Sequence, residues 1–368
     1  MTPAKAPPDF NPITAAFALR GNVLSVGPCG HGHINETYEL VCDDHGVRTR
    51  YVLQRINHHV FKNVPALMEN VQRVTQHVRA KQPRALALVP TRDGAWVKQD
   101  SAGDWWRTYD YVERAVTVER VTTEAQAREA ARAFGEYQAL LVDLPGGRLN
   151  DTIPNFHHTR SRFETLRRAV NEDTQDRVAG VRAEIDFATA READTDVLLD
   201  LLARGELTER VTHNDTKINN VMLDDVTGRC AAVIDLDTVM PGLSLYDFGD
   251  MVRTAASSTA EDNPDPTQMH VVLPYFRALV DGYLESAGAV LNATERAHLG
   301  FSGQLLAFET GLRFLTDHLQ GDVYFRIHRP GHNLDRARTQ FALVKSIEDN
   351  ADAMRRIVAA AEKTTTVF

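Results

Sequence analysis

The segment 211–237 constrains the fold of this chain more than any other. It contains two short apolar runs, 221–223 and 232–234, which are separated by a polar turn at 224–228. Runs of this length on either side of a turn predict a β-hairpin. Three polar residues lie at the ends of the predicted hairpin: Asp215, Asn220 and Asp235. The hairpin would bring these three residues to one place and so predicts a polar site.

The spacing of His213, Asp215 and Asn220 is that of a phosphoryl-transfer catalytic loop, His-x-Asp followed by Asn after four residues. This chemistry needs a carboxylate that accepts the proton of an attacking hydroxyl, which predicts Asp215 as the base. It also needs oxygen ligands for Mg²⁺, which predicts Asn220 and Asp235. Asp and Asn also favour turns, so an ordinary polar loop is the alternative.

Two further features flank this motif. Lys217 follows the predicted base by two residues and would neutralise charge on the transferred phosphate. Asp247 and Asp250 are three residues apart, so they fall on one side of a helical turn. One of them would brace the catalytic loop through its backbone N–H groups. A capping box with solvated charges is the alternative for this pair.

A glycine-rich segment, 27–38, lies between two candidate strands. Glycines such as Gly30 and Gly32 let backbone N–H groups approach phosphate oxygens closely, so the segment predicts a phosphate-covering loop. It is not a Walker A motif, because no Gly-Lys-Ser/Thr follows. An ordinary glycine turn is the alternative, and His31 and His33 are interpreted as loop residues rather than metal ligands.

The periodicity of apolar residues changes along the chain. Strands are predicted at 22–27, 38–42, 50–56, 95–98 and 105–112, with one helix at 66–80. Helices follow at 123–142, 160–170, 182–204, 265–287, 293–320 and 333–362. The sequence therefore predicts an α+β fold, with a small N-lobe at 1–113 and a larger, mostly helical C-lobe at 114–368. A length of 368 residues is typical of two domains.

Charge and cysteine usage exclude several classes of protein. The net charge is -9, and no dense basic run is present, so nucleic acid and anionic membranes are not expected partners. No run approaches the roughly 18 apolar residues of a membrane span, and the N-terminus shows no signal-peptide pattern. The three cysteines form no disulfide framework, which favours a cytoplasmic protein. The oligomeric state is left open.

The motifs at 214–220, 234–242 and 246–250 together resemble those of the aminoglycoside-phosphotransferase-like small-molecule kinases. Within that group the chain looks most like the N-acetylhexosamine 1-kinases. Further segments carry this resemblance: 17–19, 32–35, 51–54, 106–109, 301–303, 311–315, 321–325 and 332–340. The resemblance implies a bilobal, protein-kinase-like fold with a small antiparallel sheet in the N-lobe and a larger helical C-lobe.

The resemblance also implies a site for ATP, Mg²⁺ and a sugar. The implied nucleotide-binding residues are Gly30, Gly32, Asn35, Gln54, Tyr109, Tyr111 and Val112. Arg313 and Tyr324 would hold the hexosamine, N-acetylglucosamine or N-acetylgalactosamine, although a surface salt bridge is the alternative for Arg313. Asp215 would receive the proton of the anomeric hydroxyl as that oxygen attacks the γ-phosphate of ATP, giving a sugar 1-phosphate.

The chain departs from the expected kinase pattern at three positions. Gln54 stands where kinases usually place a strand lysine, so Glu69 on the following helix cannot form the usual ion pair with it. His31 stands where an acidic or small residue is expected. Thr254 stands where the resemblance implies an aromatic residue near the sugar, and a smaller pocket wall would change which sugar fits.

Two other functions fit the sequence. The first is a kinase of the same fold with another acceptor: an aminoglycoside, choline, homoserine or a different sugar. The second is an inactive nucleotide-binding module, which only the missing strand lysine supports. A protein kinase is not expected, because no Asp-Phe-Gly directly follows the hairpin and no Ala-Pro-Glu segment is present.

Overall fold

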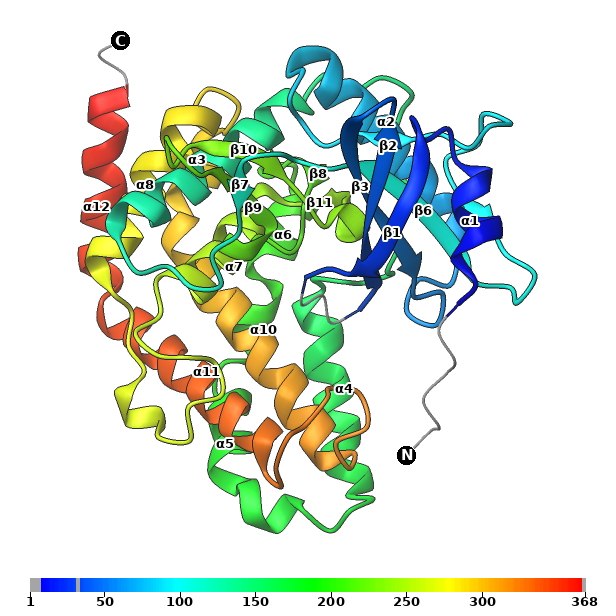
Figure 1. The fold of residues 1–368 in the computed structure, drawn as a ribbon. Coiled ribbons are helices and arrows are strands. Elements are labelled where there is room, and N and C mark those ends of the chain that lie inside the picture. Colours follow the sequence, from blue (N-terminus) through cyan, green and yellow to red (C-terminus); the bar gives the residue numbers. More distant parts are fainter. Residues whose placement is uncertain (1–7, 31–33, 366–368) are drawn as a thin grey trace. The chain divides into compact units, whose positions relative to one another are not determined.

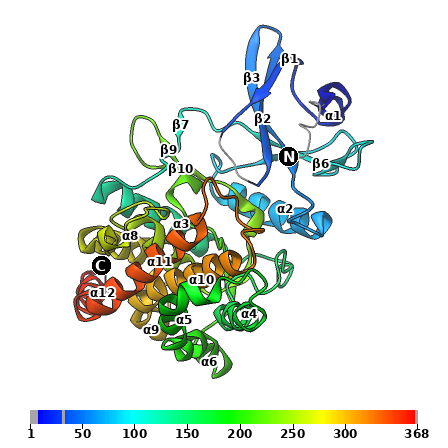
Figure 2. The same ribbon diagram turned by 90° about the horizontal axis from the view of Figure 1, so that it is seen from below.

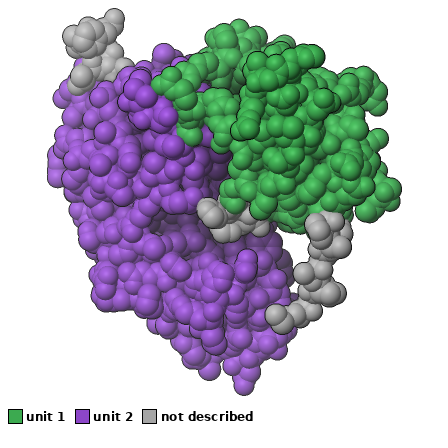
Figure 3. Space-filling view, viewed as in Figure 1, with its two compact units in different colours: residues 1–115, 144–153 green, residues 116–143, 154–368 purple. Residues whose placement is uncertain are grey.

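The computed structural model describes residues 8–30 and 34–365. It has an antiparallel sheet in its N-terminal region and mostly helices in its C-terminal region (Figure 1), so the predicted α+β fold class is confirmed. The chain forms two compact units (Figure 3). One comprises 1–115 and 144–153, and the other comprises 116–143 and 154–368.

The first unit is built on one antiparallel sheet in the order β1-β2-β3-β6-β4, with β5 also pairing with β6. Its strands are β1 (Asn22–Pro28), β2 (Glu36–Asp44), β3 (Val47–Ile56), β4 (Leu88–Val89), β5 (Lys98–Gln99) and β6 (Trp105–Asp110). Its helices are α1 (Phe10–Ala16) and α2 (Val64–Lys81). His45 and Gly46 both have positive φ, 54° and 87°, which suits the tight turn that joins β2 to β3.

Side chains of alternate strand residues form the core of this unit. Leu40 and Cys42 on β2, Leu53 on β3 and Trp106 on β6 are fully buried, and Phe17 at the end of α1 packs against them. Period-2 burial of this kind is what the alternating sequence of β2 predicts. Cys42 therefore belongs to the apolar core, where a reduced thiol behaves as a small hydrophobic side chain.

The segment 144–153 belongs to the first unit although it follows the predicted lobe boundary by thirty residues. Its Asn150 exchanges hydrogen bonds with the buried Asn70 of α2: Asn150 N donates to Asn70 Oδ1 (2.9 Å), and Asn70 Nδ2 donates to Asn150 O (2.8 Å). Arg73 also donates to the carbonyl oxygens of Pro145 and Gly147. The compact units thus divide the chain differently from a single cut after residue 113.

The second unit is mostly helical. Its helices are α3 (Glu124–Leu140), α4 (Thr159–Glu172), α5 (Arg182–Thr189), α6 (Val197–Ala203), α7 (Ser244–Ala255), α8 (Leu273–Ala287), α9 (Ala293–Ala297), α10 (Leu299–Leu319), α11 (His332–Asp349) and α12 (Ala351–Thr365). Short 3₁₀ helices span Val178–Val181, Glu192–Asp196, Ile218–Asn220, Leu236–Thr238 and Pro266–Gln268. The remaining strands are β7 (Ala115–Val116), β8 (Arg210–Thr212), β9 (Val221–Asp224), β10 (Cys230–Val233) and β11 (Met240–Gly242). They form a sheet in the order β10-β9-β7 and a pair β11-β8.

Helix α10 is the long central helix of this unit and packs against α4, α7 and α11 (Figures 1 and 2). Two glycines allow α7 to approach it closely. A side chain at Gly249 would meet the backbone carbonyl of Ser302, and one at Gly303 would meet Val252. Because both positions need the missing Cβ, α7 and α10 hold one fixed arrangement. Both helices carry residues of the candidate site.

The predicted long helices at 182–204, 265–287, 293–320 and 333–362 are wrong as single elements, since each is interrupted. The first is broken by the 3₁₀ turn Glu192–Asp196, and the last is broken at Asn350. In the second, Asp265 caps a separate 3₁₀ turn, and α8 begins only at Leu273 with proline in its first turn. Apolar periodicity continues through such short breaks, so spacing alone does not reveal them.

Candidate active site

The predicted hairpin is confirmed and brings together the polar residues at its ends. Strands β9 and β10 pair antiparallel, with Val221 opposite Val233. Beyond this pair, Ile234 N donates a hydrogen bond to Asn220 O at 2.9 Å. This bond brings Asp235, the next residue after Ile234, close to Asn220 in the chain fold. Asp235 has left-handed backbone angles (φ 58°, ψ 58°) and is exposed. The chain therefore turns sharply at Asp235, as it leaves the hairpin.

Asp215 lies at the centre of the polar site. Asn220 Nδ2 donates to Asp215 O (2.8 Å) and to its carboxylate oxygen Oδ2 (3.1 Å), while Lys217 Nζ lies 2.7 Å from Oδ1. Burial raises the pKa of the Asp215 carboxyl, but Lys217, His213 and Arg253 together lower it below its usual value. Burial lowers the pKa of Lys217, and Asp215 and Asp250 raise it by more. Asp215 and Lys217 thus form an ionised pair at neutral pH.

The backbone before Asp215 is held by Asp247 on α7. Its Oδ2 accepts a hydrogen bond from His213 N (3.0 Å), and its Oδ1 accepts one from Asn214 N (2.7 Å). Thr216 Oγ1 donates to the carbonyl oxygen of Asp247 (2.6 Å). Burial raises the pKa of Asp247 to about 6, against the lowering by His213 and the two N–H groups. The predicted brace is confirmed for Asp247, and the alternative of a solvated capping carboxylate is wrong because Asp247 is only 2% exposed.

Side chains on neighbouring strands fix the rest of the loop. Asn214 has positive φ (65°), a conformation that Asn tolerates better than most residues. Its Nδ2 donates to Thr238 O (2.9 Å), and its Oδ1 accepts from Thr212 Oγ1 (3.0 Å). Thr238 Oγ1 donates to His213 O (2.7 Å), and His213 Nε2 lies 2.9 Å from Ile234 O. The loop is therefore bonded to both strand pairs around it.

Asp250 also faces a buried polar environment. Its Oδ1 accepts two hydrogen bonds from Arg253, from Nε (2.9 Å) and Nη2 (2.7 Å), and Arg253 Nη1 donates to Glu261 (2.6 Å). Among the described residues, the buried Oδ2 of Asp250 has no hydrogen-bond partner. Thr254, one turn later, uses its hydroxyl to bond Asp250 O (2.8 Å). The Thr254 hydroxyl thus donates its hydrogen bond within its own helix.

Arg313 and Tyr324, the predicted sugar-binding residues, lie close together. The Arg313 guanidinium carbon is 6.0 Å from the centre of the Tyr324 ring, 5.3 Å from that of Phe325 and 6.0 Å from that of Phe156. Tyr324 is 71% exposed. In the described part of the chain Arg313 makes no salt bridge, so the alternative of a surface ion pair is wrong, and the guanidinium lies among aromatic rings instead.

Asp317, which the sequence reasoning missed, holds the segment that carries Tyr324. Its Oδ1 accepts from Val323 N (2.9 Å) and Tyr324 N (2.8 Å), and its Oδ2 accepts from Phe325 N (2.9 Å) and Asn333 Nδ2 (2.8 Å). Asp317 lies on α10, one turn after Arg313. The only sequence signal was a carboxylate four residues after an arginine, which is common on exposed helices.

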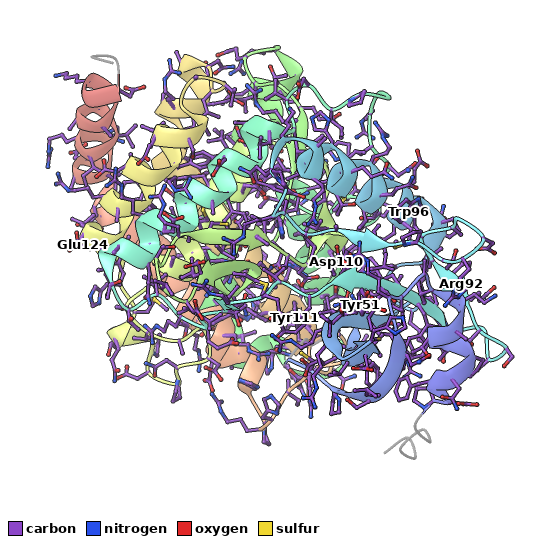
Figure 4. All side chains as sticks on the ribbon, turned by 45° about the horizontal axis from the view of Figure 1, so that its top comes forward. Tyr51, Arg92, Trp96, Asp110, Tyr111 and Glu124 are labelled. Carbon is purple, nitrogen blue, oxygen red and sulfur yellow. The ribbon has the colours of Figure 1, made fainter. Side chains whose placement is uncertain are left out.

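The residues predicted to bind nucleotide lie in the first unit. Asn35 Oδ1 accepts from Asn57 N (2.9 Å), and Gln54 Oε1 accepts from Arg107 Nε (3.0 Å) and Nη2 (2.8 Å). Tyr109 is buried in the sheet, and Tyr111 lies just beyond β6 (Figure 4). The guanidinium carbon of Arg50 is 3.8 Å from the centre of the Tyr111 ring. Val112 follows it in the chain.

Two other predictions for this unit have different outcomes. Gly30 has positive φ (76°), whereas Gly32 and His31 lie outside the described residues. Glu69 accepts from Asn150 Nδ2 (3.1 Å) and lies 3.9 Å from Arg73. The sequence did not anticipate Arg107, a buried cation that orients Gln54 where a lysine was expected.

The family model for the phosphotransferase enzyme family matches residues 25–288, more than half of the chain. The chain belongs to this family. The matched region includes the catalytic loop, the hairpin and α7, but not Arg313 or Tyr324. The predicted class of enzyme, a phosphotransferase, is therefore confirmed, and the match leaves the acceptor undetermined.

Solved structures of other phosphotransferases have a similar fold. A microcompartment-associated aminopropanol kinase is 17% identical with a TM-score of 0.57, covering 93% of this chain and 97% of its own. An aminoglycoside phosphotransferase from Alicyclobacillus acidocaldarius is 12% identical with a TM-score of 0.60, and the match covers 100% of this chain and 99% of that protein. An amicoumacin kinase in complex with AMP-PNP and Ca²⁺ is 13% identical with a TM-score of 0.56, covering 92% of both chains. At these identities the likeness shows the fold.

The two residues predicted to hold a metal ion carry oxygen atoms of the kind that Mg²⁺ prefers. Asn220 turns its Nδ2 toward Asp215, which leaves its carbonyl oxygen on the other side, and Asp235 adds a carboxylate at the adjoining end of the hairpin. Within 8–30 and 34–365, no group of three or more His, Cys, Asp or Glu could hold a metal ion. Mg²⁺ commonly takes only one or two carboxylates and completes its shell with phosphate oxygens and water. The two residues fit that pattern.

None of the helices within the described residues is both long and apolar enough to cross a membrane.

Proposed function

We propose that this phosphotransferase transfers the γ-phosphate of ATP to the anomeric hydroxyl of an N-acetylhexosamine. The observation that carries the proposal is the ionised Asp215 carboxylate, held by Asn220 and Lys217 on a braced loop. A general base must be deprotonated before it can accept a proton, and the lowered pKa of Asp215 meets this requirement at neutral pH.

The reaction follows from the groups around Asp215. Its carboxylate accepts the proton of the anomeric hydroxyl while that oxygen forms a bond to the γ-phosphorus. The bond between the γ-phosphorus and the bridging oxygen breaks, and ADP leaves with that oxygen. Lys217, whose ammonium lies 2.7 Å from Asp215, would stabilise charge on the phosphoryl group during transfer.

Asn220 and Asp235 would hold Mg²⁺ in this account. The bound ion would neutralise charge on the nucleotide phosphates. The chain's own contribution is to fix both oxygen ligands at one end of the hairpin, through the bond from Ile234 N to Asn220 O. The nucleotide itself would contact Gly30, Gly32, Asn35, Gln54, Tyr109, Tyr111 and Val112, as the resemblance implies.

The surroundings of Arg313 favour a neutral sugar over a cationic acceptor. Burial lowers the pKa of Arg162 on α4, the positive charge of Arg313 lowers it further, and the carboxylate of Glu309 raises it, so two guanidinium groups and one carboxylate act on one another here. Choline or an aminoglycoside would bring a third positive charge to this place. A sugar hydroxyl instead accepts hydrogen bonds from a guanidinium, and the exposed Tyr324 ring offers a face for the sugar.

Thr254 is part of the proposal because it stands where an aromatic residue is implied. Its hydroxyl bonds the backbone of its own helix, so it would contribute a small apolar wall rather than a hydrogen bond. The site would then accept a bulkier hexosamine substituent than an aromatic wall allows. We further place the reaction in the cytoplasm, where ATP is available and the free thiols Cys29, Cys42 and Cys230 stay reduced.

The test is phosphorus NMR with proton coupling after incubation with Mg-ATP and either N-acetylglucosamine or N-acetylgalactosamine. We expect a phosphate resonance coupled to the anomeric proton. A sugar 6-phosphate would support kinase activity but would show that the anomeric hydroxyl is not the group that is phosphorylated. If neither sugar yields a phosphate ester, while an aminoglycoside, choline or homoserine does, the sugar assignment is wrong. Nucleotide binding with no turnover of any of these acceptors would point to an inactive module.

A further inference from the structure

His157 lies between the catalytic loop and α10, and no sequence motif predicts a role for it. Its Nε2 is 2.9 Å from the carbonyl oxygen of Asn214, the residue before Asp215. Its Nδ1 is 2.9 Å from Glu309 Oε1 on α10. The His157 side chain is 8% exposed and that of Glu309 only 1%, so the pair is removed from solvent.

The partners of the two ring nitrogens determine the protonation state of His157. A backbone carbonyl oxygen can only accept a hydrogen bond, and so can an ionised carboxylate. Both ring nitrogens must therefore carry a proton if both bonds are to form. A further hydrogen bond, from Thr159 Oγ1 to Glu309 Oε2 (2.7 Å), favours the ionised form of Glu309. This geometry corresponds to a buried ion pair between an imidazolium and a carboxylate.

We propose that His157 is an imidazolium, held by Glu309, that positions the Asn214 carbonyl and thereby the backbone that carries Asp215. His157 is a positioning residue in this account, since it acts on the loop and contacts neither phosphate nor acceptor. The proposal rests on the proposed role of Asp215 as the base. It adds a hydrogen bond that fixes the position of that base.

The peptide unit between Asn214 and Asp215 is held at both ends. Its carbonyl oxygen is bonded to His157, and its N–H, on Asp215, donates to His213 Nδ1 at 3.3 Å. The preceding N–H, on Asn214, donates to Asp247. Because Asn214 is in the left-handed region, its peptide units need such partners to stay in place. Losing the His157 bond would free the peptide that immediately precedes Asp215.

The charges around His157 are mostly negative. The titratable and charged groups that face it or its partner are Glu309 and Arg313 on α10, Arg162 on α4, and Tyr246, Asp247 and Asp250 on α7. Burial lowers the pKa of His157, but Glu309, the Asn214 carbonyl oxygen and Asp250 together raise it by more, so the net shift is upward. Burial raises the pKa of Glu309, but His157 and Arg313 lower it below its usual value. Both directions agree with the ion pair that the hydrogen bonds require.

The first test observes the charge of His157 directly and needs no substrate. Nitrogen-15 NMR of the imidazole in the full chain, with His157→Gln to assign the signal, is followed from pH 6 to pH 9. We expect two protonated ring nitrogens at pH 7, and loss of a proton only well above the usual histidine range. In Glu309→Gln the same titration should move to lower pH. A neutral His157 at pH 7 in the unmodified protein would overturn the proposal.

The second test measures the effect on turnover. His157→Phe removes the donor to Asn214, and we expect kcat to fall by about 10- to 100-fold, the range for a lost hydrogen bond from a charged group. His157→Gln, whose amide can still donate, should recover part of this loss. In Glu309→Gln the alkaline limb of the kcat profile should move to lower pH, while KM for ATP stays within about twofold because nucleotide binding is not altered.

The matched control is His332→Gln on α11. His332 is also a buried histidine beside a carboxylate, with Nε2 3.2 Å from Asp262 Oδ2 and Nδ1 3.2 Å from His328 N, so within the described residues its ring nitrogens bond groups outside the catalytic loop. We expect it to lower stability without moving the alkaline limb. Equal loss of kcat in both histidine variants would overturn the positioning role. A protonated His157 in a protein inactive toward both N-acetylhexosamines but active on another acceptor would overturn only the sugar assignment.

Discussion

Replacing Asp247 with asparagine tests the brace on the catalytic loop. The two carboxylate oxygens of Asp247 accept from His213 N at 3.0 Å and from Asn214 N at 2.7 Å. In Asp247→Asn one oxygen remains as an acceptor. The other position becomes an NH₂ group that faces a backbone N–H, which leaves a buried donor without a partner. The loop must then shift or lose a hydrogen bond.

The two contributions to stability oppose each other. A hydrogen bond to a charged group contributes about 1.5–3 kcal/mol, and an unsatisfied buried donor costs about 1–3 kcal/mol, so the brace is weakened by roughly 3–5 kcal/mol. Burial, however, outweighs these hydrogen bonds and raises the pKa of the Asp247 carboxyl from its ordinary 3.8 to about 6, so the ionised form carries a net penalty of about 3 kcal/mol. The neutral asparagine does not carry this penalty.

We therefore expect Asp247→Asn to change the free energy of unfolding by no more than about 2 kcal/mol while lowering kcat strongly. The same 3–5 kcal/mol is also lost from the state in which Asp215 is correctly placed, which corresponds to a fall in kcat of about 10²- to 10³-fold or more. Urea unfolding at pH 7 measures the first quantity, and initial rates of ADP formation with the acceptor measure the second.

Asp173→Asn is a control that removes a carboxylate charge without removing an acceptor. Asp173 Oδ1 alone accepts hydrogen bonds from the backbone N–H groups of Arg177 (2.8 Å) and Val178 (3.1 Å), so the amide oxygen of the variant can keep both. This variant should leave kcat unchanged. If Asp247→Asn keeps more than a tenth of kcat, or if both variants lose activity equally, the argument that Asp247 positions the loop is refuted.

Three further predictions follow from the same structure. Because the pKa of Asp247 is raised, its contribution to the free energy of unfolding is greatest below pH 3.8 and is lost as the pH rises to about 6, which unfolding curves at several pH values measure. The rate constant kcat should instead rise through pH 6 as Asp247 ionises, which a pH–rate curve measures. Lys217→Met should raise the pKa of Asp215, lower kcat about 10- to 100-fold and move the acid limb to higher pH, since the nearest positive charge is removed. Asp317→Asn should loosen the segment of Tyr324 and raise KM for the acceptor about three- to tenfold, with KM for ATP unchanged as the internal comparison.

The features that the sequence predicted well are local ones. The hairpin of 221–223 and 232–234 follows from two apolar runs and a turn, and the structure pairs Val221 with Val233. The brace by Asp247 was foreseen as one of two possibilities, because an acidic residue in the first turn of a helix is also typical of capping. The burial of Asp247 and the hydrogen bonds that it accepts from two backbone N–H groups show that it braces the loop rather than capping the helix in solvent.

The features that were missed depend on tertiary contacts. His157 lies 57 residues from Asn214 and 152 residues from Glu309, and no spacing rule connects such positions. Arg107 faces Gln54 only because β3 and β6 pair in that register. Packing, rather than propensity, also decides that the apolar periodicity of 182–204 is divided between two helices and a 3₁₀ turn.

The most direct test of the central claim compares Asp215→Asn with the unmodified protein in the phosphorus NMR assay with Mg-ATP and N-acetylhexosamine. The amide has nearly the same shape as the carboxylate but cannot take up the proton of the hydroxyl. We expect the unmodified protein to produce a phosphate coupled to the anomeric proton, and Asp215→Asn to produce it about 10²- to 10⁴-fold more slowly. Formation of the same product by Asp215→Asn at more than a tenth of the normal rate would contradict the claim that Asp215 is the base.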